Sequence, residues 1–124
     1  MSTSGVVDAT ETLSRYIYSR NHYRSSDQTV RYSAFIPPED NRLSVFRISG
    51  LREVDIWKIG EGLRRQQLHG RADIEAIVVN EIGLGIAADD IPPRHANIIS
   101  WPEEASAIKL KAMELADKAL LRLK

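Results

Sequence analysis

The chain has 124 residues, carries 17 basic and 17 acidic side chains, and contains no cysteine. This length fits one domain with a core that needs no covalent staple, and the missing cysteine excludes disulfides, thiolate nucleophiles, zinc–thiolate sites and iron–sulfur clusters. Balanced charge argues against a protein that binds nucleic acid through a general excess of positive charge. No apolar run approaches the ~20 residues of a membrane span, and no secretory signal is recognisable, so we expect a cytoplasmic protein that does not act at a membrane.

The chain begins with residues that show no periodicity. We therefore expect a flexible N-terminal tail over residues 1–7 and a single α+β domain over residues 8–124. Asp8 and Glu11 have the spacing of a capping box, and the apolar residues that follow recur at helical intervals. The pattern predicts a first helix over residues 9–20.

Two strands are expected next. Apolar and polar residues alternate over residues 30–34, and residues 43–48 are rich in strand formers. The turn-forming stretch 37–41 lies between them. We predict an antiparallel hairpin.

The apolar spacing over residues 54–66 predicts a second helix. Gly60 and Gly62 fall inside it, and each lowers helix propensity by about 1 kcal/mol relative to Ala. We attribute these glycines to close packing against the sheet.

A second hairpin is predicted from residues 72–79 and 84–88, which read as strands joined by a tight turn with Gly83 in a left-handed conformation. A short strand over residues 94–99 follows. Ser100 and Glu103 have capping-box spacing, and the amphipathic pattern beyond them predicts a long last helix over residues 102–123.

The predicted order is therefore α-β-β-α-β-β-(β)-α. Such an order is typical of an α+β domain in which helices cover an antiparallel sheet. We expect a mainly antiparallel sheet with three helices and the long C-terminal helix packed on the sheet.

One group of candidate catalytic residues is His69, Arg71 and Asp73. Alternate residues of an extended chain point to one side, which would bring together a proton carrier, a cation for an oxyanion or phosphate, and an orienting carboxylate. The alternative is a solvated strand entry with an Arg71–Asp73 ion pair of little energetic value.

A second group lies between two proline-containing ends, over residues 92–102. In an extended conformation His95, Asn97 and Trp101 project to one side and Arg94 precedes them. If this segment lies beside the third predicted strand, His95 and Asn97 join the first group in a polar cleft. The alternative is structural, with Asn97 bonded to loop backbone, Trp101 covering the last helix and His95 a hydrogen-bonded, partly buried side chain.

The segment 15–32 contains all four tyrosines and four arginines. Such a mixture suits base stacking with phosphate pairing and equally a protein interface. We favour a protein or a small ligand over nucleic acid. The residues that we expect to bind are Arg15, Arg20, Tyr23 and Arg24 from this segment together with Arg94, His95, Asn97 and Trp101.

No cofactor or metal site is predicted. The Gly83-x-Gly85-x-x-Ala88 stretch matches a dinucleotide-binding pattern, but the residues that follow include two prolines and cannot open the required helix. Asp89 and Asp90 with the two candidate histidines offer ligands for a divalent cation by residue type, and nothing in their spacing selects one.

Two functions are consistent with these observations. The first is a non-enzymatic binding or accessory protein that acts through a protein or ligand interface. The alternative is a small hydrolase or phosphoryl-transfer enzyme in which His69 or His95 is the acid or base, Arg71 or Arg94 neutralises charge, and Asp73 orients the base. The alternative requires both histidines to reach one cleft, and the sequence leaves the oligomeric state open.

Overall fold

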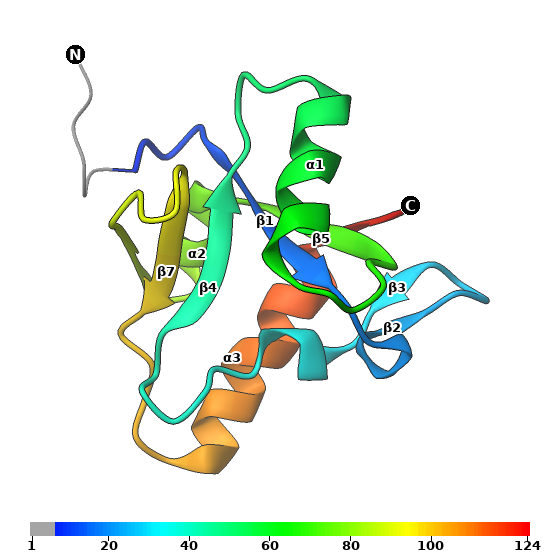
Figure 1. Cartoon of the computed structure of the whole chain (residues 1–124). Helices are drawn as coiled ribbons and strands as arrows, with labels where there is room; N and C mark the ends of the chain where they lie inside the picture. The colour runs from blue at the N-terminus through cyan, green and yellow to red at the C-terminus, as the bar shows by residue number, and fades with distance from the viewer. Residues whose placement is uncertain (1–6) are drawn as a thin grey trace.

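A six-stranded antiparallel sheet with the strand order β6-β7-β4-β1-β5-β8 organises the part of the chain that the computed structural model describes, residues 7–124 (Figure 1). A small antiparallel hairpin of β2 and β3 lies apart from it. The strands are β1 (Thr12–Ile17), β2 (Tyr23–Arg24), β3 (Thr29–Val30), β4 (Leu43–Arg47), β5 (Gly70–Glu75), β6 (Gly85–Ala88), β7 (His95–Ile99) and β8 (Leu120–Leu123). The helices are α1 (Glu53–Leu63), α2 (Ala76–Glu81) and α3 (Ala105–Lys118), with two short 3₁₀ turns, η1 (Arg20–His22) and η2 (Tyr32–Phe35).

The sheet is covered on both faces (Figure 1). One face carries the larger core cluster, in which strand residues such as Leu13 and Ile98 pack with Phe35 of η2, Val79 of α2 and Leu115 of α3. The other face carries a smaller cluster beneath α1, formed by Tyr16, Phe46, Ile48, Ile56 and Leu68. The α+β class, the three helices, the antiparallel sheet and the C-terminal helix packed on that sheet are thus confirmed.

The first predicted helix is wrong, because residues 12–17 form β1. This strand lies inside the sheet between β4 and β5, so both of its faces are buried. A strand buried on both faces loses the simple alternation of apolar and polar residues, and its apolar spacing then resembles a helix. The predicted capping residues do bond locally: the backbone N–H of Asp8 donates to Oε2 of Glu11 at 2.9 Å, in the turn that leads into β1.

The first predicted hairpin is also wrong. Of the strand predicted over residues 30–34, Val30 lies in β3 and residues 32–35 form the turn η2. The strand predicted over residues 43–48 is confirmed as β4, but it pairs with β1 and β7.

The second predicted hairpin is wrong too, because its two strands do not pair with each other. The strand β5 stops at Glu75, residues 76–81 form α2, and β6 pairs with β7 rather than with β5. Gly83 does adopt the expected left-handed conformation, with φ of 96°, in the turn between α2 and β6. Predictions of the second helix and of the short strand before the last helix are confirmed as α1 and β7.

The last helix ends earlier than predicted. Residues 105–118 are helical, and residues 120–123 form β8, which pairs with β5. Leu121 is buried against the larger core cluster, so pairing with the open edge of β5 outweighs the helical pattern at this end.

The predicted flexible tail falls on residues outside the described part, apart from Val7, which packs against the larger core cluster. Within residues 7–124, no helix has the length and apolar character required to cross a bilayer.

The pairing of β1 is unequal on its two sides. It pairs with β5 along its whole length, from Thr12↔Glu75 to Ile17↔Gly70. With β4 it pairs only at Leu13↔Arg47 and Ser14↔Phe46. Beyond Ser14 the two strands therefore separate, and the candidate site lies at this separation.

Candidate functional site

Arg15 fills the opening between β1 and β4. Its Nε donates to the carbonyl oxygen of Ala34 and its Nη1 to the carbonyl oxygen of Ser44, both at 3.0 Å. Both acceptors are uncharged. None of the ion pairs within residues 7–124 includes Arg15, so this partly buried cation has hydrogen-bond acceptors but no counterion there.

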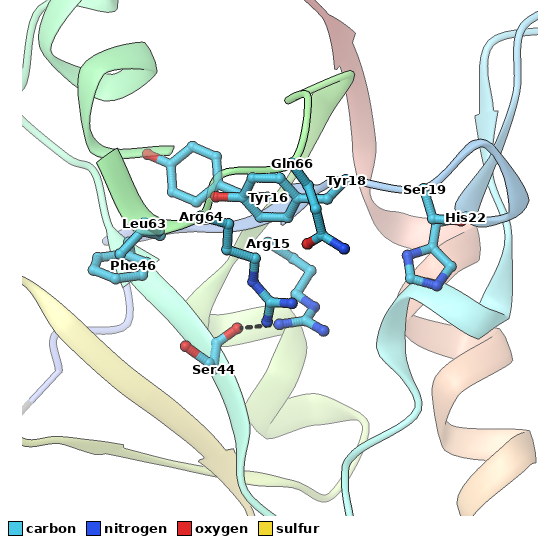
Figure 2. Close-up of a pocket in the computed structure, with 10 residues that line it drawn as sticks. All are labelled: Arg15, Tyr16, Tyr18, Ser19, His22, Ser44, Phe46, Leu63, Arg64 and Gln66. Carbon is cyan, nitrogen blue, oxygen red and sulfur yellow. Dashed lines mark hydrogen bonds between the residues drawn. The ribbon is translucent and has the colours of Figure 1, made fainter. Parts of the chain in front are cut away.

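A cavity of about 240 Å³ adjoins this guanidinium (Figure 2). Its walls come from β1, β4, the end of α1 and the segments that follow β1 and α1. None of the lining residues is acidic; they are Arg15, Tyr16, Tyr18, Ser19, His22, Ser44, Phe46, Leu63, Arg64 and Gln66. This volume is below the range of about 300–1,000 Å³ typical of pockets for drug-sized ligands, so it suits a small ion or the charged end of a larger molecule.

The cavity holds a second cation. Arg64, the residue after α1, places its guanidinium carbon 5.3 Å from the centre of the Tyr18 ring. Burial, together with the positive charge of Arg64, lowers the pKa of Arg15 to about 10. Arg15 therefore remains charged at neutral pH, in an environment that lacks negative charge.

His22 also lines the cavity. Burial and the charge of Arg15 both lower its pKa from the ordinary value of 6.5. The shift has the sign expected of a histidine that faces uncompensated positive charge. An anion in the cavity would reverse this effect.

The wall beneath α1 is fixed by two tyrosine hydroxyls. Tyr16 donates to the carbonyl oxygen of Ile56 and Tyr18 to that of Gly60, each at 2.5 Å. A Cβ atom on Gly60 would lie 2.5 Å from the Tyr16 ring, whereas one on Gly62 would meet nothing within 4 Å. Close packing therefore explains Gly60 and not Gly62.

Ser44 connects the cavity to a chain of hydrogen bonds. Its Oγ lies 2.7 Å from Nε2 of His95, and Nδ1 of the same ring lies 2.7 Å from Oδ1 of Asp89. The hydrogen bond with His95 is the main reason why the pKa of Asp89 is lowered. Because an ionised carboxylate can only accept, Nδ1 is the nitrogen that carries the proton when the imidazole is neutral, and in that form Nε2 accepts from the Ser44 hydroxyl.

The loop that carries Asp89 is tightly built. The backbone N–H groups of Asp89 and Asp90 donate to the carbonyl oxygen of His95, at 3.2 and 3.0 Å, and the N–H of Ile91 donates to Oδ1 of Asp89 at 3.1 Å. Asp90 and Arg94 have positive φ angles of 55° and 72°, a conformation that costs energy in residues other than glycine. The loop therefore maintains a strained backbone that holds Asp89 beside His95.

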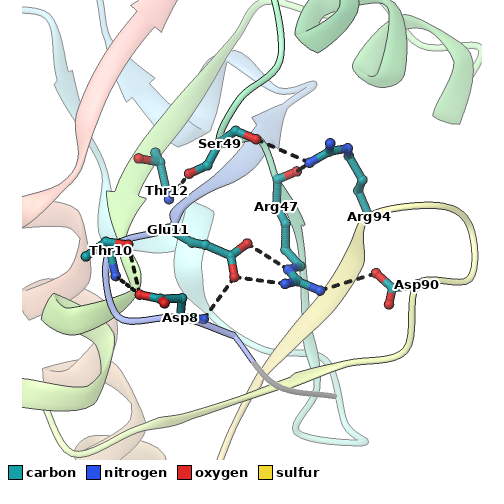
Figure 3. Close-up of polar contacts among 8 residues, drawn as sticks. All are labelled: Asp8, Thr10, Glu11, Thr12, Arg47, Ser49, Asp90 and Arg94. Atoms are coloured by element: carbon teal, nitrogen blue, oxygen red, sulfur yellow. Dashed lines mark hydrogen bonds and ion pairs between the residues drawn. The ribbon is translucent and has the colours of Figure 1, made fainter. Parts of the chain in front are cut away.

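A polar network ties this loop to β4 and to the turn before β1 (Figure 3). Glu11 accepts two 2.8 Å hydrogen bonds from Arg47, whose Nη1 lies 3.5 Å from Oδ1 of Asp90. Arg94 donates to the carbonyl oxygens of Arg47 and Ser49, at 3.2 and 3.4 Å. Arg94 thus ties the loop to the end of β4 and does not line the cavity beside Arg15.

Arg71 and Asp73 do lie together as the alternation of β5 suggested, but they are not at the cavity. The Arg71 side chain is 1% exposed and donates to Asp73 at 3.1 Å and to Glu53 at 3.0 Å, with its guanidinium 4.6 Å from the Trp57 ring. Burial raises the pKa of Asp73 even though Arg71 opposes the shift. The pair is therefore buried under α1, unlike the solvated pair considered above.

The two candidate histidines do not share a cleft. Nδ1 of His69, just before β5, lies 3.3 Å from the Tyr23 hydroxyl, whereas His95 begins β7. Strands β4 and β1 separate β7 from β5, a distance of about 14 Å at about 4.8 Å per strand. The five-residue cluster of the sequence hypothesis therefore does not form.

The remaining predicted binding residues have separate surroundings. Trp101 is 8% exposed and donates from Nε1 to the carbonyl oxygen of Ile98 at 2.9 Å, and Asn97 is 7% exposed on β7 opposite Ser44. Arg20 and Arg24 are exposed and do not line the cavity. Of the eight residues expected to bind, Arg15 lines the cavity and His95 reaches it through Ser44.

Sequence reasoning missed Ser44, His22 and Arg64 and considered Asp89 only as a metal ligand. Asp89 precedes His95 by six residues across a proline-containing loop, a spacing that could have suggested the contact. The Ser44–His95 contact depends on the register of β4 against β7, and this register cannot be predicted from the local sequence of either strand.

No protein-family model, characterised protein or solved structure matches this chain. Within the described range, no group of three or more His, Asp or Glu side chains is arranged to hold a metal ion. Function must therefore be argued from the geometry of the cavity.

Proposed function

We propose that this protein binds a small anion in the cavity formed by Arg15, Arg64 and His22. The observation that carries the proposal is Arg15 itself, a partly buried guanidinium whose partners within residues 7–124 are the neutral carbonyls of Ala34 and Ser44. Burying charge without a counterion is costly. A carboxylate or phosphate in the cavity would supply the missing charge.

The composition of the walls supports this ligand class. Two arginines and a histidine line the cavity and no carboxylate does. Arginine pairs with carboxylates and phosphates through two parallel hydrogen bonds. Tyr18 and Phe46 add aromatic walls, which suits an anion attached to a small apolar or aromatic group.

A small ligand is favoured over nucleic acid because three of the four tyrosines of the segment 15–32 are hydrogen-bonded to other parts of the fold. Tyr16 and Tyr18 bond to α1, and Tyr23 contacts His69. Base stacking needs aromatic rings at the surface, and of these four tyrosines only Tyr32 is exposed, with Nζ of Lys109 5.0 Å from its ring centre. We place the protein in the cytoplasm as part of this proposal, since its lack of cysteine suits a reducing compartment.

The proposal is tested by thermal unfolding with sodium phosphate, phenyl phosphate and benzoate, each at matched ionic strength. A ligand that binds only the folded state raises the melting temperature in proportion to ln(1 + [L]/Kd). We expect at least one anion to give a saturable increase that Arg64→Ala abolishes and Arg20→Ala retains. Arg64 and Arg20 are both exposed, so each variant should fold.

Two results would contradict the proposal. One is that none of the three anions raises the melting temperature. The other is that Arg64→Ala and Arg20→Ala reduce the increase equally, which would indicate general charge screening rather than a site.

A further inference from the structure

We propose that Ser44 is a catalytic nucleophile, that His95 is its general base, and that Asp89 positions His95 for hydrolysis of a small ester. The substrate preference, an ester whose acyl group carries a second anionic group, rests on the proposed anion-binding function. The assignment of Ser44, His95 and Asp89 rests on their own geometry.

The geometry has the order of a nucleophile, a base and an orienting carboxylate. Ser44 Oγ to His95 Nε2 and His95 Nδ1 to Asp89 Oδ1 are each 2.7 Å. These distances fall within the range over which a base accepts the proton of a nucleophile. The three residues come from β4, β7 and the loop between β6 and β7.

The three side chains are exposed to different degrees. Ser44 lines the cavity and is partly exposed, so a substrate can reach it. The His95 side chain is 14% exposed, and that of Asp89 is 46% exposed at the surface. Phe46 packs edge-on against the His95 ring at 5.3 Å between ring centres. The base is therefore held on three sides, by Ser44, Asp89 and Phe46.

The main chain at Ser44 provides for the negative charge that develops on an ester carbonyl oxygen. In an antiparallel strand, the N–H and C=O of one residue point toward the same neighbouring strand. The carbonyl of Ser44 points into the opening between β4 and β1, where Arg15 donates to it. The Ser44 amide faces that same opening, next to the Arg15 cation, and both are suited to stabilise an oxyanion.

The reaction has two steps. Ser44 Oγ attacks the ester carbonyl carbon as its proton passes to Nε2 of His95. The bond to the alcohol oxygen then breaks and His95 returns the proton to that leaving group. Water next attacks the acyl-Ser44 ester, His95 removes its proton, and the Ser44 oxygen leaves and regains a proton from His95. The net change is ester plus water to acid plus alcohol, with no oxidant or reductant.

The first test is covalent labelling with a fluorophosphonate followed by mass spectrometry of the peptides. We expect one adduct on Ser44 in the wild-type protein, none in Ser44→Ala, and full labelling in Ser25→Ala, whose residue is exposed near the β2–β3 hairpin. No adduct on wild-type Ser44 would overturn the proposal. Labelling of several serines, with no dependence on His95 when tested in His95→Ala, would also overturn it.

The second test is turnover of the mono-4-nitrophenyl ester of succinic acid compared with 4-nitrophenyl acetate. We expect Ser44→Ala to lower kcat on the order of 10³-fold or more, and we expect Arg64→Ala to raise KM for the succinate ester, which Arg20→Ala should leave unchanged. Asp89→Asn should lower kcat without a matching change in KM, and Asp89→Glu should restore part of it. If Asp89 has only a structural role, Asp89→Asn and Asp89→Glu should both lower the melting temperature and leave kcat of the folded protein unchanged.

These tests separate the two proposals. If phosphate or benzoate raises the melting temperature of both the wild-type protein and Ser44→Ala, but Ser44 is neither labelled nor needed for turnover, the anion site stands and the catalytic inference fails. If Ser44 is labelled and hydrolyses both esters with equal kcat/KM, while no anion binds, catalysis stands and the anion site fails.

Discussion

Nη1 of Arg15 donates to the carbonyl oxygen of Ser44 at 3.0 Å, just beyond the last backbone pairing between β1 and β4. A side-chain hydrogen bond thus replaces the next backbone hydrogen bond between these strands. The Arg15 side chain thereby supplies a donor to a backbone carbonyl where the sheet opens, and it brings a positive charge beside Ser44. The opening of the sheet, the charge of the cavity and the position of Ser44 all depend on this contact.

Arg15→Ala should destabilise the fold. The substitution leaves the carbonyl oxygens of Ala34 and Ser44 without their donor, and an unsatisfied buried acceptor costs about 1–3 kcal/mol. Urea unfolding followed by circular dichroism measures the loss. Arg20→Ala, at an exposed position, should change stability by less than about 0.5 kcal/mol. Equal stability of Arg15→Ala and wild type would show that the two carbonyls need no donor.

The two glycines of α1 should respond oppositely to alanine. At Gly60 the new Cβ would lie 2.5 Å from the Tyr16 ring and 2.9 Å from Leu68, so overpacking should cost about 1–3 kcal/mol. At Gly62 the space is open, so Gly62→Ala should add up to about 1 kcal/mol through helix propensity. Thermal unfolding of the two variants checks the pair, and a destabilised Gly62→Ala would contradict the open space described for it.

Arg71→Ala should be among the most damaging substitutions under α1. The Asp73 side chain is 10% exposed and Arg71 is its closest cationic partner, with Arg122 farther away at 3.4 Å. Removing one partner of a buried ion pair costs about 3–5 kcal/mol. The matched control is Glu53→Gln, because Glu53 is 66% exposed and its exposed contact should contribute about 1 kcal/mol or less. Comparable losses in the two variants would argue against this difference in burial.

His22 should make the empty protein less stable in mild acid. Its pKa is lowered below 6.5 in the folded state by burial and by Arg15, so the unfolded chain takes up the proton first. The free energy of unfolding should therefore fall as pH decreases below about 6.5. His22→Asn should remove this part of the pH dependence, measured by urea unfolding across that range. Identical pH slopes in the two proteins would be the contrary result.

Anion binding should have the opposite pH dependence. A bound carboxylate or phosphate favours the imidazolium form of His22, so the affinity of the wild-type protein relative to His22→Asn should rise as pH falls through the same range. The comparison between the two proteins cancels the titration of the ligand, because a phosphate monoester has a second pKa of about 6. Isothermal titration of the wild-type protein and His22→Asn with phenyl phosphate, at matched ionic strength, compares the two slopes. If affinity depends on pH to the same extent in both proteins, His22 does not face the ligand.

The sequence predicts the fold where local pattern and environment agree. The second helix, the strand β4 and the short strand β7 each have a distinct local pattern and were found as α1, β4 and β7. The error at β1 has a physical cause, since a strand between two neighbours is buried on both faces and loses its alternation. The error at β8 has a different cause: residues 120–123 are extended because they pair with β5, and the local sequence does not show that β5 has an unpaired edge.

The candidate site was predictable only in part for the same reason. Arg15 and His95 stood out by residue type, but their surroundings come from distant segments. Ser44 meets His95 across 51 positions of the sequence and Arg15 meets Ser44 across 29. Composition alone cannot show that the cavity lacks acidic residues, because the chain as a whole has equal numbers of acidic and basic side chains.

The most direct test of the anion site is a titration of the wild-type protein with phenyl phosphate, followed through the NMR signals of the arginine side-chain Nε–H groups. We predict saturable shifts for Arg15 and Arg64, with one shared dissociation constant, and no saturation at Arg20 or Arg24. Shifts that are linear in phosphate and equal at all four arginines would contradict the account, because they would show that the cavity holds no specific anion.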